Sequence, residues 1–227
     1  MTEWTLEHVL SGKPGSFSGP AWRHEVLVKL FSSRTHSKIS ARFADILCAN
    51  VLEVGCMYGN NIRFFHSLGH RCVGVEVTED MTALAQQRLK QHRIEGVPIY
   101  LGSNRELPFP DATFDVLVSV NTLHYDNGEN VIAALNEFTR VLRPDGIAFI
   151  ETAGAMHFIR QGAERLGHLR YKPRFGDFRD GGVHGLFDSL DHFDETLRSV
   201  FGEVETGRSV EQFPERMLEF YFGIGLK

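Results

Sequence analysis

The chain has 227 residues, 42% of them hydrophobic and 23% charged, and a formal net charge of -5 at pH 7. This composition is typical of a folded globular domain and argues against collagen-like, disordered and disulfide-framework proteins. The acidic balance argues against a broad nucleic-acid-binding face, which needs clustered Lys and Arg, and no apolar run is long enough to cross a bilayer. The first ten residues lack the basic and apolar regions of a secretory signal. We therefore expect a cytoplasmic protein that acts on a small molecule, with no nucleic-acid or membrane partner.

The first part of the chain alternates helical and strand patterns. After a Gly/Pro/Ser loop at residues 11–20, helical patterns cover residues 21–31 and 38–47. Strand patterns follow at 51–54, 72–77 and 97–101. Between them we expect a helix capped by Asn60 or Asn61 that stops at Gly69, and a helix opened by Thr78 and Asp80.

The second part continues the alternation and ends in a hairpin. Residues 114–120 and 147–150 read as strands, separated by a helix at 130–142. A long connection leads to a last helix at 190–200 and two strands, 204–210 and 216–226. Alternating strands and helices predict an α/β fold: a doubly wound, seven-stranded sheet with five parallel strands and a C-terminal antiparallel hairpin. We expect one domain, 1–227, divided into N-terminal cap helices (1–48), a cofactor-binding core (49–151), a cap insertion (152–188) and the last helix with the hairpin (189–227).

The cysteines indicate neither a disulfide framework nor a zinc site. Cys48, Cys56 and Cys72 are an odd number without a Cys-x-x-Cys pair. We expect reduced, mostly buried thiols and no bound metal.

The turn after the first strand is the first candidate for a binding site. Residues 51–61, VLEVGCMYGNN, contain glycines at Gly55 and Gly59. A phosphate-binding loop would need a lysine that is absent, and a dinucleotide loop would need glycines where Met57 and Asn60 stand. A nucleoside without a pyrophosphate remains, and Glu76, 21 residues after Gly55, fits a partner for ribose hydroxyls. Alone, Glu76 is equally well explained as a solvated glutamate at a strand end.

Four segments in order make the chain resemble the class I S-adenosylmethionine-dependent methyltransferases. They are VLEVGC with GNN, VGVEVTEDM, ELPFPDATFDVLVSVNTLHY and RVLRPDGIAFIE, and they cover roughly residues 51–150. The resemblance implies S-adenosylmethionine as cofactor, S-adenosylhomocysteine as product, and methyl transfer as the reaction. The chain departs from the family's pattern at Met57, where a glycine is usual, and at Ser103, where an aspartate is usual. These departures keep open the alternative of a non-catalytic protein that binds the cofactor or its product.

The resemblance also implies a role for individual residues. Glu53 and the loop backbone would line the methionine part, Glu76 would hold the ribose, and Asn121 would lie near the sulfonium. The implied cofactor-binding residues are Glu53, Gly55, Cys56, Met57, Gly59, Asn61, Glu76, Val77, Met81, Ser103, Asn104, Arg105 and Asn121.

The acceptor is less constrained by the sequence. Methyl transfer is an in-line displacement that mainly requires alignment, and a hydroxyl acceptor would be helped by a base, for which His124 is the candidate. The segment NTLH lacks the motif of enzymes that methylate amide or base nitrogens. The basic cluster at 170–174 favours a carboxylate- or phosphate-bearing acceptor, such as a nucleotide-linked sugar or an acidic metabolite, although an ion-paired, solvated cap explains it as well. The candidate acceptor residues are Trp22, His157, Arg170 and Arg174.

Overall fold

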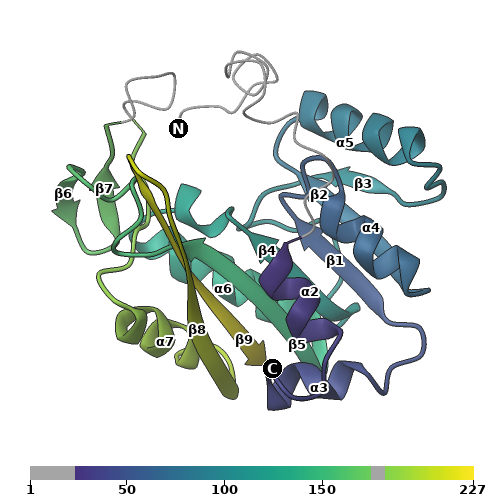
Figure 1. Cartoon of the computed structure of the whole chain (residues 1–227). Coiled ribbons are helices and arrows are strands. Elements are labelled where there is room, and N and C mark those ends of the chain that lie inside the picture. The colour runs from purple at the N-terminus through teal and green to yellow at the C-terminus, as the bar shows by residue number, and fades with distance from the viewer. Residues whose placement is uncertain (1–23, 175–181) are drawn as a thin grey trace.

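The computed structural model describes residues 24–174 and 182–227, and Trp22 lies outside them. A seven-stranded sheet with the order β3-β2-β1-β4-β5-β9-β8 forms the centre of the molecule (Figure 1). The first five strands are parallel, and β9 joins β5 and β8 in antiparallel pairs. This confirms the predicted sheet, including the C-terminal hairpin. Its strands are β1 (Asn50–Val54), β2 (Arg71–Glu76), β3 (Ile99–Leu101), β4 (Phe114–Val120), β5 (Leu142–Ala153), β8 (Glu203–Gln212) and β9 (Met217–Leu226).

Helices cover both faces of this sheet, in three layers (Figure 1). One face packs against α2, α3, α4 and α5, and the other against α6 and α7. Side chains alternate between the two cores along β4, where Val116 and Val118 face the first and Leu117 the second. The two helices expected in the N-terminal cap, α2 and α3, thus form part of a sheet layer. The helices are α2 (Glu25–Phe31), α3 (Lys38–Phe43), α4 (Asn60–Ser67), α5 (Glu79–Gln91), α6 (Glu129–Val141) and α7 (Leu190–Arg198).

The start of α4 differs from the prediction. Neither Asn60 nor Asn61 caps the helix, because the N-cap is Gly59, in the left-handed conformation with φ 68°. Glycine has no side chain to accept the free N–H groups of the first turn. Glu53 on β1 takes that role, accepting the Ile62 backbone N–H at 3.0 Å.

The expected cap insertion, 152–188, contains a small separate sheet in its described residues. Strands β6 (Glu164–Gly167) and β7 (Arg170–Lys172) pair antiparallel. Arg160 and Arg165 bind Asp188 at 3.0 and 3.1 Å, so part of the insertion's positive charge is neutralised internally.

The three thiols are free, as expected, but they differ in burial. Cys56 and Cys72 are buried, whereas Cys48 is exposed. Over the described ranges, no cluster of metal-binding side chains occurs, and no helix is both long and apolar enough to cross a membrane.

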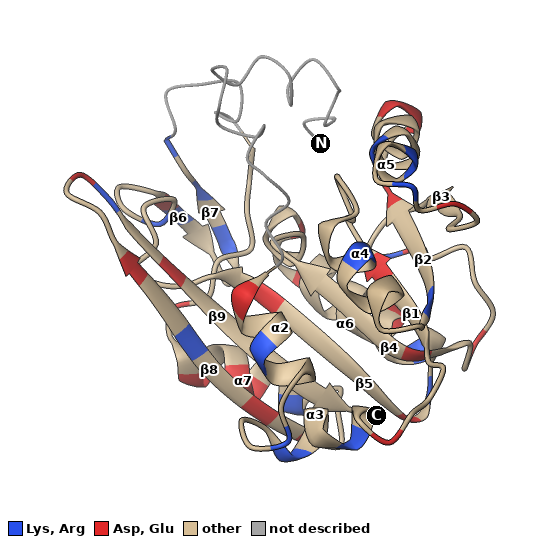
Figure 2. Ribbon diagram, turned by 45° about the vertical axis from the view of Figure 1, so that its right-hand side comes forward, with Lys and Arg blue, Asp and Glu red and all other residues tan. Residues whose placement is uncertain are grey.

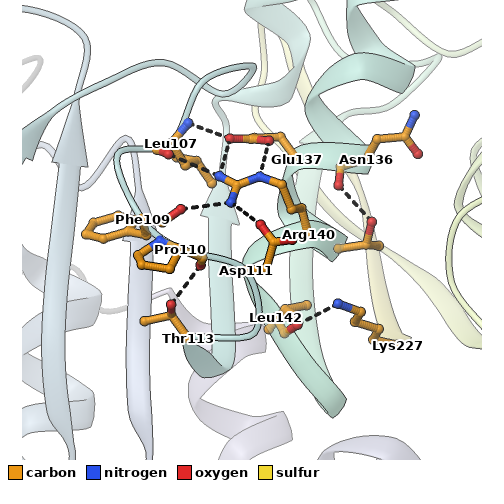
Figure 3. A network of polar contacts seen from close by, with 11 residues as sticks. Leu107, Phe109, Pro110, Asp111, Thr113, Asn136, Glu137, Arg140, Leu142 and Lys227 are labelled. Atoms are coloured by element: carbon orange, nitrogen blue, oxygen red, sulfur yellow. Dashed lines mark hydrogen bonds and ion pairs between the residues drawn. The ribbon is translucent and has the colours of Figure 1, made fainter.

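Arg140 on α6 binds the connection between β3 and β4 and so joins this connection to α6 (Figure 3). Its guanidinium donates to the carbonyl oxygens of Leu107 and Phe109 at 3.1 and 2.8 Å and to Asp111 Oδ1 at 2.7 Å. It also binds both carboxylate oxygens of Glu137, at 2.6 and 2.8 Å. These bonds hold the segment that follows Ser103, Asn104 and Arg105, three of the residues that the resemblance implies for cofactor binding.

We predict that Arg140→Met lowers the free energy of unfolding by about 2 kcal/mol, because it removes charge-assisted bonds to five acceptor atoms. For a chain of this length the melting temperature should fall by about 4–8 °C. Thermal and urea unfolding measure the change. The matched control is Arg34→Met, which breaks an exposed pair with Asp45 and should leave the free energy of unfolding nearly unchanged. Equal losses in both variants would contradict the prediction.

Candidate functional site

The carboxyl ends of the central parallel strands carry the candidate site. β1 pairs with β2 on one side and β4 on the other, so the connections leave the sheet in opposite directions beside β1. In open α/β sheets a ligand binds outside the strand ends at such a switch point. Glu53, Glu76, Asn121 and Glu151 all lie at or directly after these strand ends.

Tertiary contacts explain both glycines in the turn after β1. Gly55 has φ 69°, and a Cβ there would lie 2.0 Å from Thr122 Cγ2. Gly59 has φ 68°, and a Cβ there would lie 2.6 Å from Leu89 Cδ2. Each position therefore needs a residue without a side chain and with access to positive φ.

Met57 adopts a conformation that glycine would adopt more easily. Its φ is 43°, in the left-handed region where side-chain-bearing residues are strained. Its backbone N–H donates to Glu76 Oε1, which joins the turn to the end of β2. The positive φ at this position thus explains why the methyltransferases that the chain resembles usually have a glycine here.

Glu53 is buried, and each of its carboxylate oxygens accepts one hydrogen bond. Asn61 Nδ2 donates to its Oε1 at 2.7 Å, and the Ile62 N–H donates to its Oε2. Burial raises the pKa of Glu53 to about 8, against the lowering effect of these two bonds. The carboxyl group thus titrates near neutral pH beside the loop expected to hold the methionine part of the cofactor.

Glu76 and Val77 offer a polar and an apolar contact side by side. Glu76 is buried, and burial raises its pKa, while the N–H groups of Met57 and Val77 lower it. Val77, the next residue, is apolar and 54% exposed. Met81 is 3% exposed, so its side chain belongs to the interior beneath this surface.

Asp126 brings together two loops that are distant in sequence. Asn104 Nδ2 donates to Asp126 Oδ2 at 2.8 Å, and Arg105 Nε lies 3.1 Å from Asp126 Oδ1. Ser103 pairs with Glu106 through two backbone bonds of 3.1 Å, which closes the loop after β3. Sequence analysis missed Asp126 as a site residue, because an acid in a loop has many surface roles.

Asn121 and His124 occupy the loop after β4. Asn121 has φ 57°, and its N–H donates to the Glu151 carbonyl at 3.0 Å. Its Oδ1 is buried and has no hydrogen-bond partner among the residues of 24–174 and 182–227. His124 is 4% exposed, with its ring 4.5 Å from that of Tyr125 and 6.0 Å from that of His184.

A pair that sequence analysis missed joins the N-terminal helix to the strand ends. His24 Nε2 lies 2.7 Å from Glu151 Oε1, and the Glu151 side chain is fully buried. The His24 N–H donates to Asn61 Oδ1 at 3.1 Å, while its Nδ1 accepts the Leu27 N–H that begins α2. Burial raises the pKa of Glu151, and His24 opposes this effect. The position of Glu151, at a strand end before a long insertion, could have indicated a site residue. Its partner His24 lies 127 positions earlier in the chain, so nothing in the sequence indicated the pair.

The expected acceptor residues that the structure describes differ in exposure. His157 is 2% exposed, and burial lowers its pKa to about 4, so it is neutral at physiological pH. Arg170 and Arg174 are exposed, and Arg170 belongs to the basic strand β7 (Figure 2).

Comparisons with known proteins agree with this geometry. Residues 52–150 match a family model described as a methyltransferase domain. The uncharacterized methyltransferase YcgJ of Bacillus subtilis is 31% identical over 96 residues, which are 42% of this chain and 37% of that protein. A fatty-acid O-methyltransferase of Mycolicibacterium smegmatis is 32% identical over 109 residues, 47% of this chain and 38% of the other. The chain therefore covers less than two-fifths of the length of either relative.

Solved structures share the fold over most of the chain. The crystal structure of YcgJ aligns with a TM-score of 0.63 and 18% identity, over 84% of this chain and 97% of the other. A Burkholderia thailandensis 1,6-didemethyltoxoflavin-N1-methyltransferase, crystallised with S-adenosylhomocysteine, aligns with a TM-score of 0.60 and 20% identity, over 84% of this chain and 75% of that one. Residues 52–150, which contain the glycine turn and the strand-end carboxylates Glu53 and Glu76, are therefore similar to a methyltransferase domain, and most of the chain shares the fold of solved methyltransferases.

Proposed function

We propose that this protein transfers the methyl group of S-adenosylmethionine to a hydroxyl group of a small molecule in the cytoplasm. The observation that carries the proposal is the glycine turn at the switch point, flanked by the buried carboxylates of Glu53 and Glu76 and by the exposed Val77. A hydroxyl acceptor is supported by the similarity to a fatty-acid O-methyltransferase and by the lack of the motif for amide or base nitrogens.

The proposed position of each part of the cofactor is the one that the resemblance to class I methyltransferases implies. Glu53, Asn61 and the turn from Gly55 through Cys56 and Met57 to Gly59 would hold the methionine end. Glu76 would accept the ribose hydroxyls, with Val77 packing on the adenine and Met81 supporting it from the interior. Ser103, Asn104 and Arg105 would border the adenine edge, and Asn121 would face the methyl group. These positions fit one nucleoside across β1, β2 and β4.

The protein's contribution to the reaction is alignment and the exclusion of water. Bound S-adenosylmethionine supplies a methyl group on a sulfonium, which is transferred in line to the acceptor oxygen. The strand-end residues would orient the two reactants, which is the largest demand of such a displacement. His124 in the loop after β4 is the base candidate from the sequence. His157, Arg170, Arg174 and Trp22 are the candidates for binding an anionic acceptor.

A non-catalytic role in binding the cofactor or its product is the second candidate. The strained backbone of Met57 and the serine at Ser103 favour it, because both depart from the family's usual residues at the cofactor site. Binding of S-adenosylmethionine without methyl transfer to any acceptor would support this second role.

We predict micromolar binding of S-adenosylmethionine and S-adenosylhomocysteine in calorimetric titration, and none of NAD. Glu76→Ala should weaken binding at least about tenfold, because a charged acceptor of hydrogen bonds is worth about 1.5–3 kcal/mol. The control Glu79→Ala removes an exposed glutamate at the start of α5 and should leave affinity unchanged. Unchanged affinity in Glu76→Ala would contradict the ribose assignment.

Replacing Met57 by glycine tests the strain in the turn. Met57→Gly should raise the free energy of unfolding by about 1 kcal/mol, since glycine adopts positive φ without cost. It should also tighten binding of S-adenosylmethionine, because the loop backbone becomes easier to approach. Arg93→Gly is the matched control: Arg93 also has positive φ (59°) but is exposed after α5, so it should stabilise without changing affinity. Weaker binding by Met57→Gly would show instead that the Met57 side chain contacts the cofactor.

The raised pKa of Glu53 predicts a pH-dependent affinity. With a folded-state pKa of about 8, Glu53 holds a proton at pH 7 that the unfolded chain has released. Its contribution to stability therefore decreases as pH rises from about 4.5 to about 8. If the ionised form binds the cofactor's ammonium group, affinity for S-adenosylhomocysteine should rise by up to about tenfold per pH unit below pH 8. Titrations from pH 6 to 9 measure this, and Glu53→Gln should remove the slope. The same slope in both proteins would contradict the assignment.

A further inference from the structure

We propose that Glu151 is the catalytic residue that binds the acceptor hydroxyl and receives its proton, with His24 as its positioning residue. This inference rests on the proposed function and adds a residue beyond the family match, which ends at residue 150. In the reaction, the acceptor O–H bond breaks and its proton goes to Glu151 Oε2. The oxygen forms a bond to the methyl carbon, and the carbon–sulfur bond breaks with its electron pair remaining on sulfur.

The first support is an unsatisfied acceptor atom. Glu151 is 0% exposed, and within the described ranges neither of its carboxylate oxygens has a hydrogen-bond partner, although His24 Nε2 lies 2.7 Å from Oε1 as an ion-pair contact. A buried acceptor without a donor is costly, and such atoms in native structures often mark a ligand contact. A hydroxyl group would supply the missing donor.

The second support is the place of Glu151 in the sheet. It is paired in register with Val120, the last residue of β4, and its carbonyl accepts the N–H of Asn121. Asn121 is the residue expected beside the methyl group, and its Oδ1 is likewise buried without a partner in the described part of the chain. Two unsatisfied acceptors at the ends of adjacent strands fit a ligand that donates hydrogen bonds.

The third support is the way His24 holds the carboxylate. His24 Nδ1 accepts the Leu27 N–H, which assigns the ring proton to Nε2, and Nε2 lies 2.7 Å from Glu151 Oε1. This fixes one oxygen and leaves the other for an acceptor. The acidic end of β5 lies beside the start of α2 (Figure 2). Since Glu151 is closed to solvent, a hydroxyl bound there does not compete with water.

The charged groups acting on Glu151 are consistent with this role. His24 from α2 stabilises the carboxylate, and Glu211 from β8 opposes it at longer range. The backbone N–H of His24 also donates to Asn61, and Asn61 donates to Glu53. Polar contacts therefore connect Glu151, at the proposed acceptor site, with Glu53, at the proposed methionine site. His124, by contrast, lies with its ring against Tyr125 and His184.

The test measures transfer of a labelled methyl group from S-adenosylmethionine to a panel of simple alcohols, phenols and hydroxy acids. Glu151→Gln keeps an oxygen atom beside His24 Nε2 but cannot act as a base. Its turnover should fall by about 100-fold or more, the usual contribution of a general base, while the Kd for S-adenosylhomocysteine stays within about threefold. The wild-type rate should rise with pH as Glu151 ionises, and Glu151→Gln should lose this rise. Glu151→Asp should recover part of the turnover, and His24→Ala should lower it with cofactor affinity kept.

A matched control separates this role from a general effect of charge. Glu203→Gln changes an exposed carboxylate on β8 that binds Arg42 at 3.2 Å, and it should keep wild-type turnover. Unchanged turnover in Glu151→Gln, or its loss only in His124→Gln, would overturn the role of Glu151 and leave the proposed function standing. A wild-type protein that binds S-adenosylhomocysteine but methylates no hydroxyl would overturn both. A wild-type protein that does not bind it would reject the proposed function at the cofactor step.

Discussion

The burial of carboxylates at the carboxyl ends of the parallel strands is the constraint on which the site depends. Glu53 accepts two hydrogen bonds from the start of α4, and Glu151 Oε1 lies 2.7 Å from Nε2 of His24, which precedes α2. A buried carboxylate is costly unless it is paired, so each one requires a helix start at a defined place. Asn61 and His24 connect the two groups, and the positions of both helices are therefore tied to the same strand ends.

The same constraint explains the turn between β1 and α4. The helix has no capping side chain because Gly59 precedes it, and a Cβ at either glycine would collide with a neighbouring element. Glu53 replaces the missing cap from across the turn. Gly55 and Gly59 leave no side chain at either end of this loop, and Glu53 anchors the helix that follows it. Met57, within the loop, has a φ of 43°, which is strained for a residue with a side chain.

Polar contacts between loops complete the arrangement around the strand ends. Asp126 holds Asn104 and Arg105, and Arg140 holds the segment that follows them. Each contact joins residues that are more than twenty positions apart, so the loop after β3 is fixed by the loop after β4 and by α6. The insertion at 152–188, which contains His157, Arg170 and Arg174, has its own small sheet and ion pairs of Arg160 and Arg165 with Asp188.

Sequence alone determined the order of elements, the seven-stranded sheet and the glycine turn with Glu76, because hydrophobic period and turn chemistry are local properties. It placed most strand boundaries within about two residues, but β5 begins at Leu142, five residues before the predicted start, and includes the residues expected as a turn. Sequence also erred where a distant group competes with a local one. Asn60 and Asn61 look like caps, yet Glu53 from the neighbouring strand caps the helix.

Only the tertiary structure decided which distant residues meet. The pairing of His24 with Glu151 and of Asp126 with Asn104 has no local signal, because a single His or Asp in a helix start or loop is compatible with many surroundings. The surroundings of each residue are fixed when α2 packs against β5 and when the loop after β4 packs against the loop after β3. The burial that raises the pKa of Glu53 and Glu151 has the same origin, since it depends on which helices cover the strand ends.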